Sequence, residues 1–262
     1  MTLKILLVSD LHRGFLTDKQ LRKFFEKTKE EAGHIDVVIN AGDDGGHLSG
    51  GKDKAFMNRL MRRTFPDKYI ISLMGNHDWW CNGDKHGFGG RPTVHDHFSN
   101  LKVIKKSISQ TGVLMPDVEE AYHLFKVEGA LYFIVAVGGW YSHPNPPTND
   151  LKHVAATHEE LRQIAHNKLQ AQLEDLDDTR KFYPDLKVIF ASHFPVIKAG
   201  AGDWKGRFED FSWSEGIGEL MQETYGCKHF LCGHSHQLHA GPLRFEAGSD
   251  YGKPKYQIVT VE

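Results

Sequence analysis

Short runs of apolar residues are the most regular pattern along this chain of 262 residues. Several of them lack the period of an amphipathic helix and end in a polar residue. Runs of four to eight apolar residues are typical of strands that are buried on both faces, as in a parallel sheet. The pattern therefore predicts buried strands at residues 3–8, 36–41, 69–74, 186–191 and 229–232.

Segments with a helical period separate the first three strands. Thr17 and Gln20 have the spacing of a capping box at the start of one helix, and Gly33 marks its end. A second helix is expected near residues 54–63. Strands and helices that alternate in this way predict parallel strands with right-handed crossover connections, and therefore an α/β fold.

The second half of the chain adds one long helix and several shorter elements. The helix is expected at about residues 155–176, where Thr157 and Glu160 form a second capping box. Its inward face is expected to carry Leu161, Ile164, Leu169, Leu173 and Leu176. Further predicted elements are a helix at 214–225 and strands near 122–127, 131–137 and 256–261.

Two stretches interrupt this order of elements. Residues 79–100 are rich in glycine and histidine, and residues 138–150 contain several prolines. Both are predicted to be loops, and loops of such length in a compact domain are usually functional or mobile. Because no linker or internal repeat is visible, we expect a single domain over residues 1–262 with loop insertions near 79–100 and 138–150.

Charge and cysteine content narrow the class of protein. The formal net charge is -2 and no lysine- or arginine-rich block is visible, so the sequence does not indicate binding to a nucleic acid backbone. The three cysteines have no CxxC spacing, which favours free thiols in a reducing compartment. No apolar run approaches the ~20 residues of a membrane span. We therefore expect a cytoplasmic protein without a membrane segment.

Polar side chains follow the five buried strands directly. The carboxyl ends of parallel strands share one edge of an open α/β sheet, where ligands bind. Each cluster taken alone has a simpler interpretation as a turn, a surface loop or a packed histidine. Clusters at the ends of all five strands together predict one site instead. Its candidate residues are Asp10, His12, Asp43, Asn76, His77, Asp78, His193, His234 and His236.

The chemistry of these side chains favours a metal site. Imidazole, carboxylate and amide oxygen suit divalent ions such as manganese, iron or zinc, and the clusters contain no thiolate. His234 and His236 would share one face of an extended segment, because alternate side chains point to the same side. A carboxylate that bridges two ions allows them to lie about 3.5–4 Å apart.

The order of the motifs resembles one known superfamily. From Asp10 to His236 the chain carries Asp-x-His, Gly-Asp, Gly-Asn-His-Asp, a single His and Gly-His-x-His, which is similar to the calcineurin-like metallophosphoesterases. The resemblance implies a four-layer α/β/β/α sandwich with a dinuclear metal site at the C-terminal strand ends. It also implies the ligands: Asp10, His12 and His236 for one ion, Asn76, His193 and His234 for the other, and Asp43 as the bridge.

The resemblance further implies a phosphoesterase with two divalent metal ions, with manganese (Mn2+) expected and iron, zinc, nickel or cobalt as alternatives. A metal-bridging hydroxide would attack a phosphate mono- or diester. His77 is expected to stabilise the phosphoryl charge or to protonate the leaving oxygen, and Asp78 to fix the tautomer of His77. The presence of His77 favours a phosphodiesterase, since the poor alkoxide leaving group of a diester benefits from a nearby acid that protonates it.

Other functions are compatible with the same fold. Protein phosphatases of this superfamily usually have a Val-Asp-Arg-Gly-like stretch after Gly-Asp and Glu after Gly-Asn-His. This chain has Asp44-Gly45-Gly46 and Asp78 there, which disfavours that class. A nuclease would be expected to carry a basic patch, and a non-catalytic binding or scaffold protein to have lost a ligand or His77. The expected substrate is therefore a small-molecule or nucleotide phosphate ester.

The aromatic residues beside the motifs leave two interpretations open. They could form an apolar wall for a nucleobase or a leaving group, or they could pack in the core. These residues are Trp79, Trp80, Trp140 and Tyr141.

Overall fold

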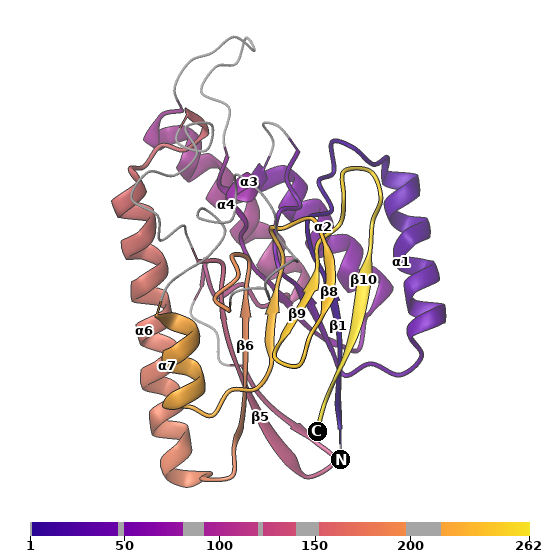
Figure 1. The fold of residues 1–262 in the computed structure, drawn as a ribbon. Helices are drawn as coiled ribbons and strands as arrows, with labels where there is room; N and C mark the ends of the chain where they lie inside the picture. The colour runs from indigo at the N-terminus through magenta and orange to yellow at the C-terminus, as the bar shows by residue number, and fades with distance from the viewer. Residues whose placement is uncertain (1, 47–49, 81–91, 120–122, 140–151, 198–215) are drawn as a thin grey trace.

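The strands of the protein form two sheets, in agreement with the two β layers that the resemblance implies. The five strands whose ends carry the candidate residues are divided between these sheets and do not share the edge of one. The mixed α/β character predicted from the sequence is confirmed. The computed structural model (Figure 1) describes residues 2–46, 50–80, 92–119, 123–139, 152–197 and 216–262.

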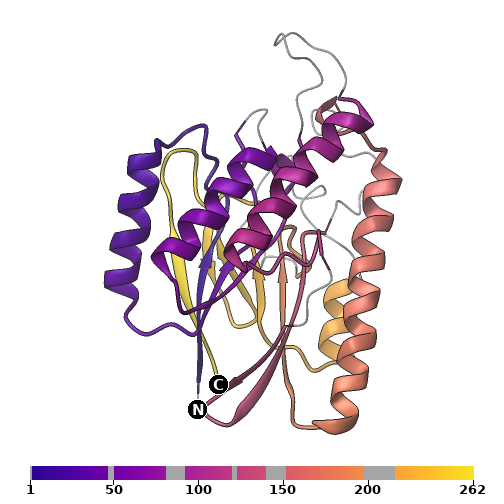
Figure 2. The same ribbon diagram turned by 180° about the vertical axis from the view of Figure 1, so that it is seen from behind.

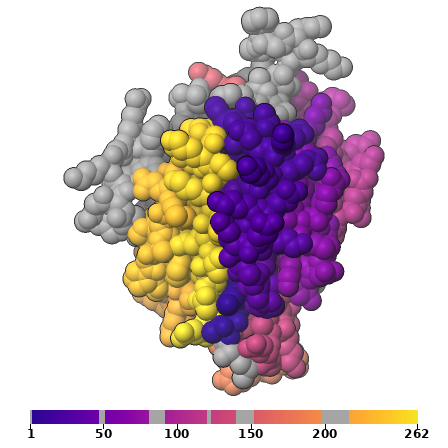
Figure 3. All heavy atoms as spheres, turned by 90° about the vertical axis from the view of Figure 1, so that its right-hand side faces the viewer, coloured from indigo at the N-terminus to yellow at the C-terminus, as the bar shows by residue number. Residues whose placement is uncertain are grey.

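The first sheet joins the two ends of the chain. Its members are β1 (Leu3–Val8), β2 (Val37–Asn40), β3 (Tyr69–Ser72) and β10 (Tyr256–Val261). The order is β10-β1-β2-β3, in which the first three strands of the chain are parallel and β10 runs antiparallel to β1. Figure 3 shows the result on the surface, where the C-terminal segment lies directly against the N-terminal segment.

The second sheet contains the remaining strands. Its members are β4 (Leu124–Val127), β5 (Ala130–Val137), β6 (Lys187–Ser192), β7 (Phe230–Cys232), β8 (Leu238–Ala240) and β9 (Arg244–Ala247). The order is β4-β5-β6-β7-β9-β8, with β5, β6, β7 and β9 parallel and an antiparallel strand at each edge.

Helices cover the outer faces of both sheets (Figure 1, Figure 2). They are α1 (Asp18–Ala32), α2 (Gly50–Thr64), α3 (Asn76–Trp79), α4 (Val94–Thr111), α6 (His158–Phe182) and α7 (Ile217–Glu223). Apolar residues of α1, α2 and α4 pack with the first sheet, and those of α6 and α7 with the second. Among the described residues, no helix is both long enough and apolar enough to cross a membrane.

Neighbouring side chains along each strand enter different cores. In β1, Leu6 packs in the core under α1 and α2, whereas Leu7 packs between the two sheets. In β5, Phe133 packs in the core under α6, whereas Ile134 packs between the sheets. Both faces of β1 and β5 are therefore buried, which explains why these strands have continuous apolar runs instead of a polar alternation.

The expected loop at residues 79–100 is wrong in its last part. α4 begins at Val94, and Thr93 and Asp96 form the capping box that starts it. Its buried residues Ile104 and Ile108 belong to the core that also contains residues of α2. The glycines of this stretch end before Thr93, and a polar, histidine-containing first turn conceals the helical period in the sequence.

Smaller differences concern the ends of elements. The long helix α6 continues to Phe182, and Ile164, expected on its inward face, is 39% exposed. The predicted helix at 214–225 is the shorter α7 in the described part of the chain. Of the expected loop at 138–150, residues 140–150 lie outside the described residues.

Candidate metal centre

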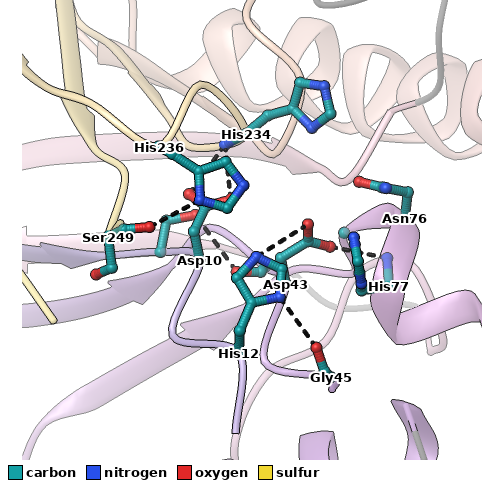
Figure 4. A network of polar contacts seen from close by, with 12 residues as sticks. Asp10, His12, Asp43, Gly45, Asn76, His77, His234, His236 and Ser249 are labelled. Atoms are coloured by element: carbon teal, nitrogen blue, oxygen red, sulfur yellow. Dashed lines mark hydrogen bonds and ion pairs between the residues drawn. The ribbon is translucent and has the colours of Figure 1, made fainter. Parts of the chain in front are cut away.

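The segments that follow β1, β2, β3, β6 and β7 carry the candidate residues. Figure 4 shows several of these side chains gathered around Asp43. Backbone hydrogen bonds join the loops after β1 and β2, where the N–H of Asp10 donates to Gly42 and that of His12 donates to Asp43. The N–H of His234, after β7, donates to the carboxylate of Asp10 at 3.0 and 3.1 Å. The structure thus brings together Asp10, His12, Asp43, Asn76, His77, His193, His234 and His236 from both sheets.

Two sets of metal-binding side chains lie within this group. In the first, ligand atoms of Asp10, His12 and His236 all lie within 4.8 Å of one another. In the second, the same holds for ligand atoms of Asp43, His193 and His234. Asn76 adds its amide oxygen to the second set, 3.1 Å from His193 Nε2.

One oxygen of Asp43 faces both sets. Its Oδ2 lies 3.9 Å from His12 Nε2 and 3.5 Å from His193 Nε2. The other oxygen, Oδ1, accepts the backbone N–H of His77 at 2.9 Å, which prevents the carboxylate from turning. One carboxylate oxygen of Asp43 therefore lies between the two sets of side chains.

Backbone carbonyls hold three of the imidazole rings in one orientation. A carbonyl only accepts, so each Nδ1 carries the proton of the hydrogen bond and each Nε2 faces the centre. The pairs are His12 with Gly45 (3.1 Å), His193 with Ala41 (2.8 Å) and His236 with Ser249 (2.9 Å). This is the tautomer that a metal ion requires of a histidine ligand.

The electrostatics of the centre fit bound cations. Within the described residues, His12 Nε2 is buried without a hydrogen-bond partner. His193 Nε2 faces three acceptor-capable atoms, of Asn76 at 3.1 Å, His234 at 3.2 Å and Asp43 at 3.5 Å. One proton can satisfy only one of them, whereas ligand atoms around one ion bound at ~2.1 Å lie about 3.0–3.4 Å apart.

The ionisation of the buried groups supports the same conclusion. Burial lowers the pKa of His12 to about 3 and the pKa of His234 well below its usual value, so both are neutral and able to bind a metal. Burial alone would raise the pKa of Asp43, but the neighbouring histidines hold it well below its usual range. Burial opposes a charge on His193, but Asp43 and Asp10 outweigh it and raise the pKa of His193 to about 9. One imidazolium does not balance the two nearly inaccessible carboxylates Asp10 and Asp43, so further positive charge is required.

The backbone at the centre is strained at the candidate ligands themselves. Positive φ angles are uncommon for residues other than glycine, and such strain is typical of functional sites. Among the described residues, only Glu128, in a turn, has such an angle outside this group. The others are Asp10 (55°), His12 (38°), Asp43 (57°), His234 (72°) and His236 (56°).

Glycines allow the ligand-bearing loops to approach one another. A Cβ atom on Gly75 would lie 2.1 Å from Asp43 Oδ1, and one on Gly233 would lie 1.8 Å from Ser9 Oγ. No side chain can be accommodated at either distance. Close packing in the centre therefore requires glycine at positions 75 and 233, both of which belong to the sequence motifs.

Asp78 is placed differently from the sequence hypothesis, which paired it with the ring of His77. Its carboxylate accepts four backbone N–H groups at 2.9–3.0 Å, and within the described residues His77 Nδ1 is buried without a partner. Asp78 therefore positions the loop that carries Asp43, instead of the His77 ring. The four donors are Asp43, Asp44, Gly45 and Gly75.

A fully buried lysine completes this support. Lys54 Nζ lies 2.9 Å from Asp44 and 3.3 Å from Asp78, and none of the three side chains is exposed by more than 1%. Burial opposes a charge on Lys54, but the two carboxylates outweigh it and raise its pKa. Lys54 carries little signal in the sequence, where it is only a lysine on the inward face of a predicted helix.

Asp78→Asn is expected to weaken both the fold and metal binding. An amide retains one accepting oxygen and turns an N–H group toward backbone donors, and Lys54 loses a counter-charge. We expect the free energy of unfolding to fall by roughly 3 kcal/mol and metal affinity by about 10- to 100-fold. Urea unfolding and metal titration calorimetry measure these quantities.

The matched control is Asp178→Asn, which removes an exposed carboxylate paired with Lys181. This control should leave both quantities unchanged, since exposed ion pairs contribute little. Wild-type metal affinity in Asp78→Asn would contradict the positioning role.

Two further buried carboxylates were also missed. Asp117 accepts the N–H of Met74 at 2.8 Å and that of Gly138 at 2.7 Å, and so joins the end of β3 to the end of β5. Glu246 accepts the N–H of Ser235 at 3.0 Å and its hydroxyl, and so holds the loop of His234 and His236. No local motif marks these residues, because their partners are supplied by other elements of the fold.

The structure describes two of the four aromatic residues beside the motifs, and both are buried. Trp79 and Trp80 are only 9% and 5% exposed, in agreement with core packing. Trp80 also stacks on His77, with ring centroids 3.7 Å apart, and so restrains that ring. Trp140 and Tyr141 lie outside the described residues.

Comparison with known proteins found a matching family and similar solved structures. The calcineurin-like phosphoesterase family matches the chain over residues 3–238. The structure is similar to phosphopantetheinyl hydrolase from Mycobacterium tuberculosis, with a TM-score of 0.66, 18% identity, and coverage of 95% of this chain and 90% of that chain. It is also similar to TT1561 of Thermus thermophilus, with a TM-score of 0.59, 15% identity, and coverage of 99% and 98%. No curated protein matches the sequence. At these identities the two structures show a shared fold.

Proposed function

Because the chain belongs to the calcineurin-like phosphoesterase family, we propose that this centre holds two divalent metal ions and hydrolyses a small-molecule or nucleotide phosphate ester. One ion would be held by Asp10, His12 and His236, the other by Asn76, His193 and His234, with Asp43 shared. The observation that carries the proposal is Asp43 Oδ2, which faces both ligand sets at 3.9 and 3.5 Å.

The remaining features of the proposal follow from the family and the ligand types. Manganese is the proposed ion, since oxygen and imidazole ligands suit it, with iron, zinc, nickel or cobalt as alternatives. When bound, the two ions supply Lewis acidity toward the phosphoryl oxygens and acidify the attacking water. The two sheets with their covering helices would form a four-layer sandwich, as a single domain of a cytoplasmic protein.

His77 is the proposed acid of the reaction. Its ring contacts the ring of His12, with centroids 4.6 Å apart, and one of its ring nitrogens lies within 4.8 Å of ligand atoms of His12 and Asp43. Its backbone N–H is fixed to Asp43, and Trp80 stacks on the ring. From this position His77 can donate a proton to the leaving oxygen, which matters most for alkoxide leaving groups and favours diesters.

Two ester substrates test this proposal. Purified protein with added manganese should hydrolyse p-nitrophenyl phosphate or bis-p-nitrophenyl phosphate, and the rate should disappear with EDTA. A phosphopantetheinyl ester belongs in the same panel because one similar structure is a phosphopantetheinyl hydrolase. No metal-dependent turnover of any ester would support a non-catalytic binding or scaffold protein instead. A strong preference for the monoester would overturn the preference for diesters.

His77→Ala is expected to lower kcat by about 100-fold or more while metal content is unchanged, because the residue donates a proton but is not among the proposed ligands. Metal analysis of the purified variant and steady-state kinetics measure the two quantities. Trp80→Phe, which keeps a ring against His77, is the matched control and should retain most of the activity. Equal activity of His77→Ala and wild type would rule out the acid role.

A further inference from the structure

An exposed pair of aromatic rings lies beside the candidate metal centre. Phe15 and Tyr251 have ring centroids 4.7 Å apart at an angle of 57°. Phe15 follows the first ligand loop, and its N–H donates to the carbonyl of His12 at 2.8 Å. Tyr251 lies two residues after Ser249, whose carbonyl accepts from the ring of His236. The backbone therefore ties each ring to a segment that carries or orients a candidate ligand.

Tyr251 contacts two candidate ligands of the same ion. Its ring lies 4.6 Å from that of His236 and 5.0 Å from that of His12, at angles of 30° and 32°. Those two imidazoles are themselves stacked, 5.0 Å apart at 4°. A molecule in contact with Tyr251 would thus be separated from the first ligand set by the thickness of one ring.

The exposure of the pair argues against a purely structural role. Tyr251 is 48% exposed and Phe15 43%, whereas His12 beneath them is completely buried. Single exposed apolar residues are common, but two adjacent exposed aromatic rings at the edge of a candidate active site are typical of a ligand-binding surface.

Within the described residues, the charged side chains closest in sequence to the pair form ion pairs. Asp250, next to Tyr251, forms an ion pair with Lys253 at 3.1 Å, and Arg13, near Phe15, pairs with Asp18 and Asp53. The surface offered by the rings is therefore apolar and planar. It suits stacking with a flat ring better than binding of a second charged group.

We propose that Phe15 and Tyr251 form a specificity subsite for a planar aromatic group of the substrate, such as the base of a nucleoside phosphate. This inference rests on the proposed phosphoesterase function, and it extends it by naming the organic part of the ester. Stacking of a base on an aromatic side chain tolerates different bases, so the subsite selects nucleotides as a class instead of one base.

Two substrates with the same leaving group isolate the contribution of the base. Adenosine 5′-monophosphate and ribose 5-phosphate both release a primary alcohol, but only the first carries a base. With manganese-loaded wild type, kcat/KM for adenosine 5′-monophosphate should be about tenfold higher or more. Where neither monoester is hydrolysed, both serve as competitive inhibitors of bis-p-nitrophenyl phosphate hydrolysis, and the ratio of their inhibition constants should show the same preference.

Variants of the two rings test whether these rings cause the preference for adenosine 5′-monophosphate. Phe15→Ala and Tyr251→Ala should remove most of the preference, measured as the ratio of kcat/KM for the two compounds in each variant, whereas Tyr251→Phe should retain that ratio. Tyr69→Ala is the matched control, since Tyr69 is 60% exposed but lies at the start of β3, at the far end of the strand from the centre. The subsite would be overturned if the wild type did not prefer adenosine 5′-monophosphate over ribose 5-phosphate. It would also be overturned if the variants lowered kcat/KM for both compounds by the same factor.

The two proposals can fail separately. Loss of turnover for every ester would contradict the phosphoesterase function, and binding of the two compounds by isothermal titration calorimetry would then still test the subsite. Normal turnover of the p-nitrophenyl esters with equal binding of adenosine 5′-monophosphate and ribose 5-phosphate would contradict only the subsite.

Discussion

Asp43→Asn is expected to abolish metal-dependent ester hydrolysis, with a loss in kcat/KM well above the roughly 100-fold typical of residues that only support a metal ligand. The carboxylate faces both ligand sets with Oδ2 and accepts the N–H of His77 with Oδ1. The amide of asparagine has a single oxygen. Whichever way the amide is turned, either the oxygen that faces the ligand sets or the acceptor of the His77 N–H is lost. The negative charge that balances the centre is lost as well.

Steady-state kinetics with bis-p-nitrophenyl phosphate and metal analysis of the purified protein measure this loss. Asp36→Asn is the matched control, because Asp36 lies at the opposite end of the same strand and accepts the N–H of Lys4. That control should retain wild-type kcat/KM and metal content. If Asp43→Asn kept both, Asp43 could not be the shared ligand.

Metal loading is expected to raise the melting temperature of the wild type by roughly 5–10 °C relative to EDTA-treated protein. An ion present at 100 times its dissociation constant stabilises the folded state by roughly 2.7 kcal/mol, and a chain of this size gains about 2–4 °C for each kcal/mol. The physical cause is the buried pair of carboxylates, Asp10 and Asp43, which lack a full counter-charge without cations. The strained backbone of the ligand residues adds to the instability of the metal-free centre.

Thermal unfolding with and without manganese measures this shift. The same titration on Asp43→Asn is the control, and the shift should be much smaller there. An unchanged melting curve of the wild type at saturating manganese would count against a metal centre at this place. The experiment needs no substrate, so it separates metal binding from catalysis.

The centre is supported by buried carboxylates that are not among the proposed ligands. Asp78 holds the loop of Asp43, Asp117 joins the ends of β3 and β5, and Glu246 holds the loop of His234. Each accepts backbone N–H groups that would otherwise be buried without partners. Such fixed partners keep the ligand loops in place before any ion binds.

The sequence alone predicted most strands and the residues that follow them. Apolar runs and capping boxes are local signals, so β1, β6 and the start of α6 agree closely with expectation. The candidate ligands could be identified for the same reason, since each lies directly after a strand. α4 was missed in part because its first turn carries no apolar period.

Only the tertiary structure shows which strands belong to which sheet and which groups pair with the buried charges. Asp117 binds Met74 and Gly138, which are 43 and 21 residues away, and Lys54 reaches both Asp44 and Asp78. Phe15 and Tyr251 come from opposite ends of the chain and meet because β10 pairs with β1. Local patterns determine which side chains stand at the strand ends, whereas contacts between distant segments determine how those side chains are oriented and what surrounds them.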